Sequence, residues 1–455
     1  MVLLLLKRTI SYLFLLFVFA SHINSLSIFE VVERVVNNSP ELRVIFEKKD
    51  QAISDYKDAR SSYLPKIYFL FNREYSKVDP IISSTQTSWN SINKFQLLVE
   101  QKLFDMEQTS KILKYSQVIQ SSEFENQKLL ESIIQLSVQS YYDVIQAEYL
   151  VSIYKEYLRQ VREVEKITLN MRQQGDANLG DVNLVQSRLA SANSNFLLYQ
   201  ANLDKSKLKL SYLLNLIDKN QLADYKNIFP DLTNKDFYDL GDRIVSVIPV
   251  SPEELIDQVL NNNLDILIIR SGLCVAGYDL ETQRARYLPQ VSAQVELKSE
   301  EDRAQNTYSR VGKFNIEARY TIYDGGSRSA ANKKFESSVK QAQYNYDILI
   351  RDVSDQSYST LNQLKSYEQQ RVSILKEIEA AEEVDRVYNI QFQFANRTLT
   401  DRLDNLERLT NARSKLVQMD YSILSTRLQI LSLMGMFVEF FGFQNYLEAS
   451  RLKLC

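Results

Sequence analysis

The sequence predicts a mainly α-helical protein with a transmembrane β-barrel, in which a strand pair followed by long helices occurs twice. Three observations lead to this fold class. A strand pattern at 95–105 recurs at 314–324, these strands alternate apolar and polar side chains, and long stretches contain no glycine or proline. The 455 residues include only 10 Gly and 7 Pro, well below average usage, and carry a net charge of −3.

The N-terminal segment has the pattern of a secretory signal. Lys7 and Arg8 precede an apolar run over 10–20, which is followed by small and polar residues. We expect a cleavable signal peptide over 1–25. Because no later stretch offers about 18 unbroken apolar residues, we expect any membrane insertion to use strands.

The duplication sets the domain organisation. Each strand pair is preceded by Tyr-Leu-Pro, at 63–65 and at 287–289, and is followed by an aspartate. The predicted segments are a first repeat over 26–216 with strands at 66–76 and 94–104, an inter-repeat segment over 217–250, a second repeat over 251–436 with strands at 290–298 and 313–323, and a C-terminal segment over 437–455.

The predicted strands are about ten residues long, which matches a tilted strand that crosses a bilayer. In the second copy Phe314, Ile316 and Ala318 alternate with polar residues, which indicates an apolar outer face and a polar inner face. Alternation alone favours an ordinary half-buried hairpin of a soluble domain, so the rest of the sequence must decide between the two. Since the smallest known barrels have about eight strands and an open sheet edge is unstable in lipid, several chains must share one barrel.

Residues 81–174 and 327–434 contain no glycine or proline, which predicts very long helices. A helix over 106–174 would be about 100 Å long at 1.5 Å per residue. Apolar residues recur along it every three to four positions, which predicts a helix-packing seam without chemistry of its own. The seam consists of Leu130, Ile134, Val138, Tyr141, Ile145 and Tyr149.

The residue inventory argues against an enzyme. The single histidine, His22, lies in the expected signal, and Cys274 and Cys455 have no metal-ligand spacing. No glycine-rich phosphate loop is present, and the slight acidity argues against nucleic acid. We therefore expect no catalytic site, metal or cofactor. An exported coiled-coil structural or adhesion protein without a pore stays open as an alternative, although it leaves the amphipathic strands unexplained.

One segment is specific to a known family. Residues 388–404 read YNIQFQFANRTLTDRLD, Asn411-Ala412-Arg413 follows, and residues 431–435 read LSLMG. From about residue 28 to 435 the chain resembles the TolC family of outer-membrane channel-tunnels, and this segment is similar to the type I secretion subgroup.

The resemblance implies a homotrimer in the outer membrane, with a twelve-stranded barrel and a periplasmic α-helical barrel. It implies a passive exit duct for protein or small molecules in a type I secretion or efflux system. The implied partners are outer-membrane lipid, a periplasmic adaptor (membrane fusion) protein and an inner-membrane ABC exporter or proton-driven pump. The inter-repeat and C-terminal segments are expected to wrap the middle of the helical tunnel.

The resemblance also implies a periplasmic gate at the helix tips. Asp401 and Asp404, one turn apart on one helical face, would form an acidic constriction around the threefold axis. Arg397 would be the lock residue, and Asp181 at the first tip its candidate partner. The sequence departs from the family at three positions: Phe392 replaces a tyrosine of the lock, Ala395 replaces a glycine, and Arg402 stands between the two acids in the sequence.

Overall fold

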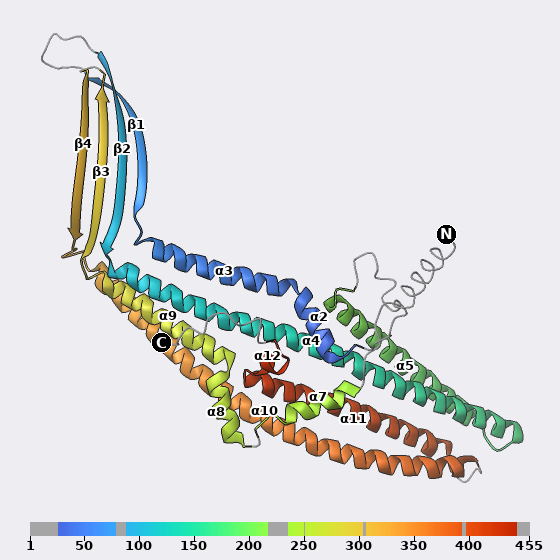
Figure 1. Cartoon of the computed structure of the whole chain (residues 1–455). Helices are drawn as coiled ribbons and strands as arrows, with labels where there is room; N and C mark the ends of the chain where they lie inside the picture. Colours follow the sequence, from blue (N-terminus) through green and yellow to red (C-terminus); the bar gives the residue numbers. More distant parts are fainter. Residues whose placement is uncertain are drawn as a thin grey trace, which may run out of the picture. The chain divides into compact units, whose positions relative to one another are not determined.

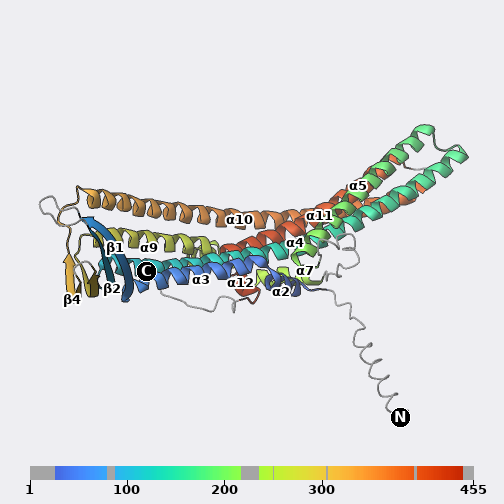
Figure 2. The same ribbon diagram turned by 90° about the horizontal axis from the view of Figure 1, so that it is seen from above.

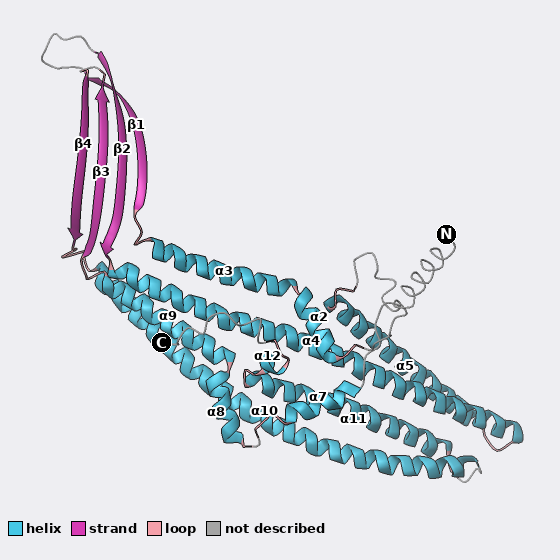
Figure 3. Cartoon of the chain, in the orientation of Figure 1, coloured by secondary structure: helices cyan, strands magenta, loops and turns pink. Residues whose placement is uncertain are grey.

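The computed structural model describes residues 26–78, 88–216, 235–249, 251–303, 306–393 and 397–443; the expected signal, residues 217–234 of the inter-repeat segment, and Ala395 and Cys455 lie outside this part. The described residues are mostly helical and form four strands, which confirms the predicted mainly α fold with a duplicated strand pair (Figure 1; Figure 3). In chain order the elements are α2 (Ile28–Asn38), α3 (Pro40–Ser61), β1 (Lys66–Val78), β2 (Ser88–Phe104), α4 (Met106–Gln174), α5 (Leu179–Leu213), α7 (Lys235–Val245), α8 (Pro252–Asn262), α9 (Leu264–Ala285), β3 (Gln290–Asp302), β4 (Thr307–Arg319), α10 (Ser327–Gln393), α11 (Leu399–Leu433) and α12 (Phe437–Phe440).

The described residues form two compact units. The tip unit comprises residues 26–43, 128–263 and 352–443, and the sheet unit comprises 44–127 and 264–351, apart from the gaps given above. The long helix predicted over 106–174 is α4, with those same ends. No single helix among the described residues is long and apolar enough to span a membrane, although α8 and α9, bent by 43° at their junction, pass the length and composition criteria together.

The sheet unit contains one antiparallel sheet in the order β1-β2-β3-β4 (Figure 3). The second strand of the first copy therefore pairs with the first strand of the second copy, from Ile92 opposite Asp302 to Phe104 opposite Val291, with a bulge between Lys102 and Phe104. The duplicated halves thus share one continuous sheet with β1 and β4 at its edges.

The strands differ in length from the prediction. Towards their hairpin turns they are longer, so that β1 reaches Val78 and β2 begins at Ser88. At the other end β4 stops at Arg319 rather than at residue 323, because its partner strand begins at Gln290, opposite Arg319. After Arg319, the described part of β3 offers no residue for β4 to pair with, so the alternation alone overestimated the length of β4.

The two faces of the sheet differ as the alternation predicts. On one face apolar residues stand in rows across the strands, with Phe69 opposite Leu97 and Leu97 opposite Leu297. The other face is mostly polar: Gln294 Nε2 donates to Glu100 at 2.8 Å, and Lys94 forms an ion pair with Glu74 at 2.7 Å. Tyr68, Leu70 and Val311 are the exposed apolar exceptions on this face. The exposed apolar face contains Ile67, Phe69, Phe71, Phe95, Leu97, Val295, Leu297, Phe314 and Ile316.

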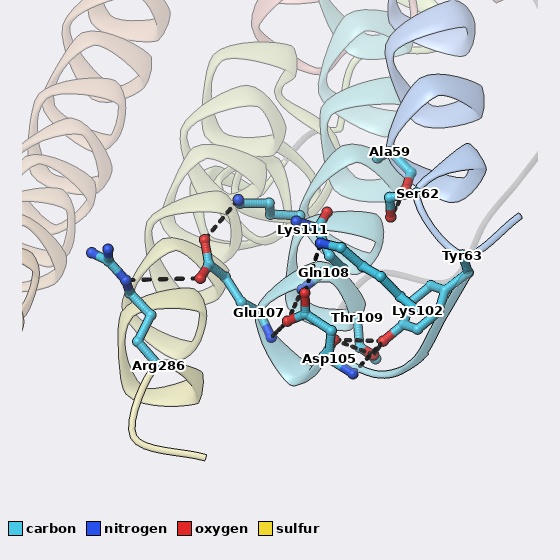
Figure 4. Close-up of polar contacts among 10 residues, drawn as sticks. All are labelled: Ala59, Ser62, Tyr63, Lys102, Asp105, Glu107, Gln108, Thr109, Lys111 and Arg286. Atoms are coloured by element: carbon cyan, nitrogen blue, oxygen red, sulfur yellow. Dashed lines mark hydrogen bonds and ion pairs between the residues drawn. The ribbon is translucent and has the colours of Figure 1, made fainter. Parts of the chain in front are cut away.

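The first Tyr-Leu-Pro marks the junction between the sheet and α4. The Tyr63 hydroxyl points at the backbone of Asp105, donating to its carbonyl at 2.5 Å and accepting from its N–H at 3.2 Å (Figure 4). Thr109 Oγ1 lies 2.8 Å from the same hydroxyl. Asp105 Oδ1 in turn accepts from the N–H groups of Glu107 and Gln108, which caps α4. The repeated motif thus joins the strand entry to the helix start.

The second copy makes this junction by different chemistry. The Arg328 guanidinium lies 4.8 Å from the centroid of the Tyr287 ring. Arg328 Nε also donates to Asp324 Oδ2 at 3.0 Å. The tyrosine and the aspartate are therefore linked through an arginine side chain instead of through a hydroxyl.

The seam predicted on α4 lies in the core of the tip unit. Its first five members, from Leu130 to Ile145, are buried. The prediction is wrong for Tyr149, which is 39% exposed, while its neighbour Leu150 is buried. At this level α4 also buries Tyr142, Val144 and Ala147, so its apolar surface extends around more of the helix than a single seam.

Candidate functional site at the helix tips

Two helical hairpin turns of the tip unit contain the predicted gate residues. α4 and α5 are joined at one turn, and α10 and α11 at the other (Figure 1; Figure 2). The two turns are corresponding parts of the duplication.

The first turn is fixed by helix caps on both sides. At the end of α4, Gly175 adopts φ of 90°, and the N–H groups of Gly175 and Asp176 reach back to the carbonyls of Arg172 and Met171. This hydrogen-bond pattern requires the left-handed conformation that glycine adopts without strain. At the start of α5, Asn178 and Asp181 form a reciprocal capping box at 2.9 and 3.0 Å. The carboxylate of Asp181 is therefore engaged in its own helix cap.

The second turn, like the first, has a side-chain cap at the start of its second helix. Thr398 is the N-cap of α11, and its hydroxyl accepts from the N–H of Asp401 at 3.2 Å. Asp401 is thus in the first turn of α11, where a negative charge is favourable against the helix dipole. Asp404 follows one turn later on the same helical face.

The two hairpins share one apolar core near the tips, which places Phe392. This residue is 4% exposed and packs in a cluster formed by side chains of all four helices. Predicted as a position in the gate lock, Phe392 is instead a core residue. The cluster contains Tyr154, Tyr157, Leu158, Val161, Val164, Val185, Ala192, Phe392, Leu399, Leu403 and Leu406.

The hydroxyl that Phe392 lacks is supplied one turn earlier by Tyr388. Arg397 Nη2 donates to the Tyr388 hydroxyl, and the guanidinium carbon lies 4.1 Å from the centroid of the tyrosine ring. Arg397 Nε also forms an ion pair with Asp401 Oδ2 at 3.3 Å. Among the described residues the predicted pair of Asp181 and Arg397 is therefore not formed within one chain, and Arg397 pairs with Asp401 instead.

The second acid has a partner on the other hairpin. Arg188 of α5 forms an ion pair with Asp404 Oδ1 through Nη2 at 2.9 Å and with Glu407 through Nη1 at 2.5 Å. Asp401, Asp404 and Glu407 follow one another at three-residue spacing on α11, and two of them share this one arginine. Arg188 is thus a polar tether between the first and second hairpins.

Arg402, which separates the two acids in the sequence, does not separate them in space. Its side chain is buried and forms an ion pair with Asp385 of α10. Asn405 also donates to Asp385 Oδ1, at 3.4 Å. Since residues three to four positions apart share a helical face, Arg402 and Asn405 bind α10 while Asp401 and Asp404 lie on another face. Arg402 therefore connects α11 to α10 and leaves Asp401 and Asp404 partly exposed.

A buried tyrosine lies beside the Arg188 tether. Burial raises the pKa of Tyr157 to about 12, with a smaller contribution from the negative charge of Glu407. The phenol therefore stays neutral at physiological pH, and Asp404, Glu407 and Arg188 are the charged groups of this tether.

The tip therefore contains three acids whose charge is partly balanced by two arginines. Arg397 accompanies Asp401, and Arg188 accompanies Asp404 and Glu407, so each carboxylate of the predicted constriction is within 4 Å of a guanidinium. Sequence reasoning placed Asp401, Asp404 and Arg397 at one tip but missed Arg188 and Tyr388. The run of three acids at three-residue spacing was a signal that a basic residue of another helix would face them.

Comparisons with known proteins agree with this architecture. The sequence matches the family described as outer membrane efflux protein over residues 31–216 and 255–436. It is similar to the alkaline protease secretion protein AprF of Pseudomonas aeruginosa, with 21% identity over 343 residues that cover 73% of this chain and 68% of the relative. It is also similar to the outer membrane protein TolC of Vibrio cholerae, with 21% identity over 425 residues that cover 90% and 91% of the two chains.

Solved structures share the fold. The outer-membrane channel OprN superposes with a TM-score of 0.76 at 18% identity, covering 90% of this chain and 89% of that one. The CmeC outer membrane channel of Campylobacter jejuni gives a TM-score of 0.76 at 17% identity, with 90% and 85% coverage. Because the family match extends over both repeats and well over half of the sequence, the chain belongs to the outer membrane efflux protein family.

Proposed function

We propose that this protein is an outer-membrane channel-tunnel that forms the exit duct of a tripartite type I secretion or efflux system. Three chains would close a twelve-stranded barrel, and their helices would form a tunnel in the periplasm. Protein or small molecules would pass through it without any chemical step. The inter-repeat and C-terminal segments would wrap the middle of this tunnel.

The sheet is the observation that carries this proposal. One face exposes apolar side chains on all four strands, and among the described residues the edge strands β1 and β4 each pair on one side only. An exposed apolar face is unfavourable in water, and an unpaired edge is unfavourable in lipid. Joining β4 of one chain to β1 of the next in a closed ring removes both problems. Because each chain supplies four strands, three chains give twelve, which exceeds the smallest known barrels.

The partners follow from the passive nature of the duct. No step of the proposed mechanism supplies energy, so an inner-membrane ABC exporter or proton-driven pump would supply it, and a periplasmic adaptor protein would connect the two. The similarity to an alkaline protease secretion protein favours a protein cargo and type I secretion. The family description, outer membrane efflux protein, leaves efflux of small molecules as the second use of the same duct.

The gate would open by separating the two hairpins at their tips. The Arg188 tether to Asp404 and Glu407 spans the hairpins and would have to break in the process, whereas the pair of Arg397 and Asp401 belongs to one hairpin and could move with it. We propose that Asp401 and Asp404 line the constriction, with Arg397 and Arg188 balancing their charge and Asp181 fixing the first tip.

Single-channel conductance of the purified mature protein in planar bilayers tests the proposal. We expect discrete pores, and a change in cation selectivity and divalent block in the double variant Asp401→Asn/Asp404→Asn. Pores that are indifferent to this substitution would retain the channel and remove the two acids from its constriction. Absence of pores from a well-folded trimer would contradict the proposed function and favour a pore-free helical protein.

A further inference from the structure

The apolar face of the sheet changes character towards the hairpin turns. Along β4, in the direction away from the helices, the residues on this face are Phe314, Gly312, Arg310 and Tyr308. On β1, Phe69 and Phe71 are succeeded by Arg73 and then Tyr75. Because side chains two positions apart lie on the same face of a strand, these arginines continue the apolar face and do not belong to the polar one.

Both arginines are exposed, and the guanidinium group of each lies against the ring of a tyrosine two residues away on the same strand. The guanidinium carbon of Arg73 lies 5.0 Å from the ring centroid of Tyr75, and that of Arg310 lies 5.0 Å from the ring centroid of Tyr308. Arg310 Nε also donates to the Tyr308 hydroxyl at 2.8 Å. Within the part of the chain that the structure describes, neither arginine forms an ion pair, so their guanidinium groups are available to an external anion.

The remaining charges on this edge of the face leave it positive. Arg303, at the β3–β4 turn, lies 3.7 Å from Glu301, and Asn93 donates to the same carboxylate at 3.0 Å. Glu301 is therefore occupied by its neighbours. Together with Arg73 and Arg310, the described charged residues on this face of the sheet end are three arginines and one glutamate, Glu301.

Because β1 and β4 are the two edges of the sheet, Arg73 and Arg310 come close to each other only where the proposed ring joins β4 of one chain to β1 of the next. We propose that at this seam Arg310 of one chain and Arg73 of the next bind the phosphate groups of an anionic lipid in the leaflet of the outer membrane remote from the helices. This inference rests on the proposed function, since it assumes that the apolar face contacts lipid. With the helices on the periplasmic side, the hairpin turns lie on the outer side, and the arginines fall where the apolar face ends and lipid headgroups begin.

The chemistry of the site favours a lipid. Guanidinium groups bind phosphate oxygens in a bidentate manner, and stacking on tyrosine limits the conformational freedom lost on binding. Next to them, Phe69, Phe71 and Phe314 form an apolar surface that acyl chains of the same molecule can cover. A free phosphate would use the arginines alone, whereas a phosphate-bearing lipid uses both parts of the surface.

The test measures lipid retention by the mature trimer. The protein would be loaded with diphosphoryl lipid A or with phosphatidylcholine of matched chain length, exchanged into detergent, and analysed by native mass spectrometry. The test variant is Arg73→Gln/Arg310→Gln. The matched control is Lys313→Gln, which removes a positive charge from β4 on the opposite face, where Lys313 stands across from Glu296.

We expect the wild type and the Lys313→Gln variant to retain lipid A in preference to phosphatidylcholine. Retention should fall about fivefold for each of the two arginines removed. Equal retention by the double arginine variant, equal loss in the control, or no preference for the phosphorylated lipid would overturn the proposal. Pore conductance is recorded on the same samples, so that loss of lipid binding with normal pores is distinguished from failure of the channel itself.

Discussion

Arg188 of α5 and Asp404 of α11 form an ion pair across two helical hairpins, with 2.9 Å between Nη2 and Oδ1. The second nitrogen of the same guanidinium contacts Glu407. A solvent-exposed pair contributes little to the stability of a fold, typically below 1 kcal/mol. In the proposed gate such a contribution would be sufficient, because about 1 kcal/mol changes the ratio of open to closed states about fivefold.

The first prediction concerns this tether. Arg188→Gln removes both contacts and should raise the closed-state leak conductance about fivefold, with little effect on the melting temperature. The matched control is Arg159→Gln, because Arg159 binds Glu156 and Glu163 within α4 and spans no hairpin. Single-channel recording at low voltage measures the leak. Equal leak in the two variants would show that the tether does not hold the gate.

The second prediction concerns Phe392. Restoring the family's tyrosine with Phe392→Tyr would place a hydroxyl in the apolar core and should lower the free energy of unfolding by about 1–3 kcal/mol. It should not tighten the gate, because Tyr388 already supplies the hydroxyl that Arg397 binds. Thermal unfolding followed by circular dichroism, together with leak conductance, measures both effects. A stable variant with reduced leak conductance would show that residue 392 takes part in closing the gate after all.

These two positions show where sequence reasoning succeeded and where it could not. The fold was predictable because each of its signals is read from a short stretch of sequence. These signals are the absence of glycine and proline from long stretches, the Tyr-Leu-Pro motif that occurs twice, and the two-residue alternation of the strands. The choice of ion-pair partner is not local. Asp181 was the predicted partner of Arg397, but in the structure Asp181 is engaged in a capping box and Arg397 pairs with Asp401, an outcome that depends on how the hairpins fold. The end of β4 likewise depends on where its partner β3 begins.

The third prediction is a pH dependence. Burial, followed by a hydrogen bond to Asp143, raises the pKa of Tyr421 above its ordinary value of 10. The folded protein therefore holds this proton more tightly than the unfolded chain, and the resulting stability is present below pH 10 and lost as pH rises through the folded pKa. Tyr421→Phe should flatten the fall of melting temperature above pH 10. The control Tyr358→Phe, at an exposed position on α10, should follow the wild type, and parallel curves for all three proteins would refute the assignment.

The fourth prediction concerns the end of α11. Gly435 adopts φ of 66°, and a Cβ atom there would lie 2.2 Å from the carbonyl oxygen of Asn262. Gly435→Ala should therefore destabilise the protein by about 2–4 kcal/mol, from both backbone strain and steric overlap. Gly442 is a control because it also has a positive φ, 81°, but open space around its Cβ position. A cost for Gly442→Ala equal to that for Gly435→Ala would show that contact with Asn262 is unimportant.

The fifth prediction uses the duplication as its own control. Tyr63 anchors the first junction through its hydroxyl, which bonds to the backbone of Asp105 and to Thr109. At the second junction Tyr287 contributes its ring, which lies against Arg328, and its hydroxyl forms no hydrogen bond with any described residue. Removal of the two hydroxyls should therefore have unequal effects. Tyr63→Phe should cost about 1–2 kcal/mol because backbone groups of Asp105 lose a partner, whereas Tyr287→Phe should be nearly neutral because the phenyl ring still accepts the cation.

Melting temperatures of the two single variants, measured side by side in the same detergent, decide the matter. A third variant tests the role of the ring. Tyr287→Leu, which removes the ring, should destabilise the second junction although Tyr287→Phe does not. Equal costs for Tyr63→Phe and Tyr287→Phe would mean that the two copies use the same interaction. Unequal costs would mean that the same three-residue motif is retained at both junctions for different physical reasons, the hydroxyl at one and the aromatic face at the other.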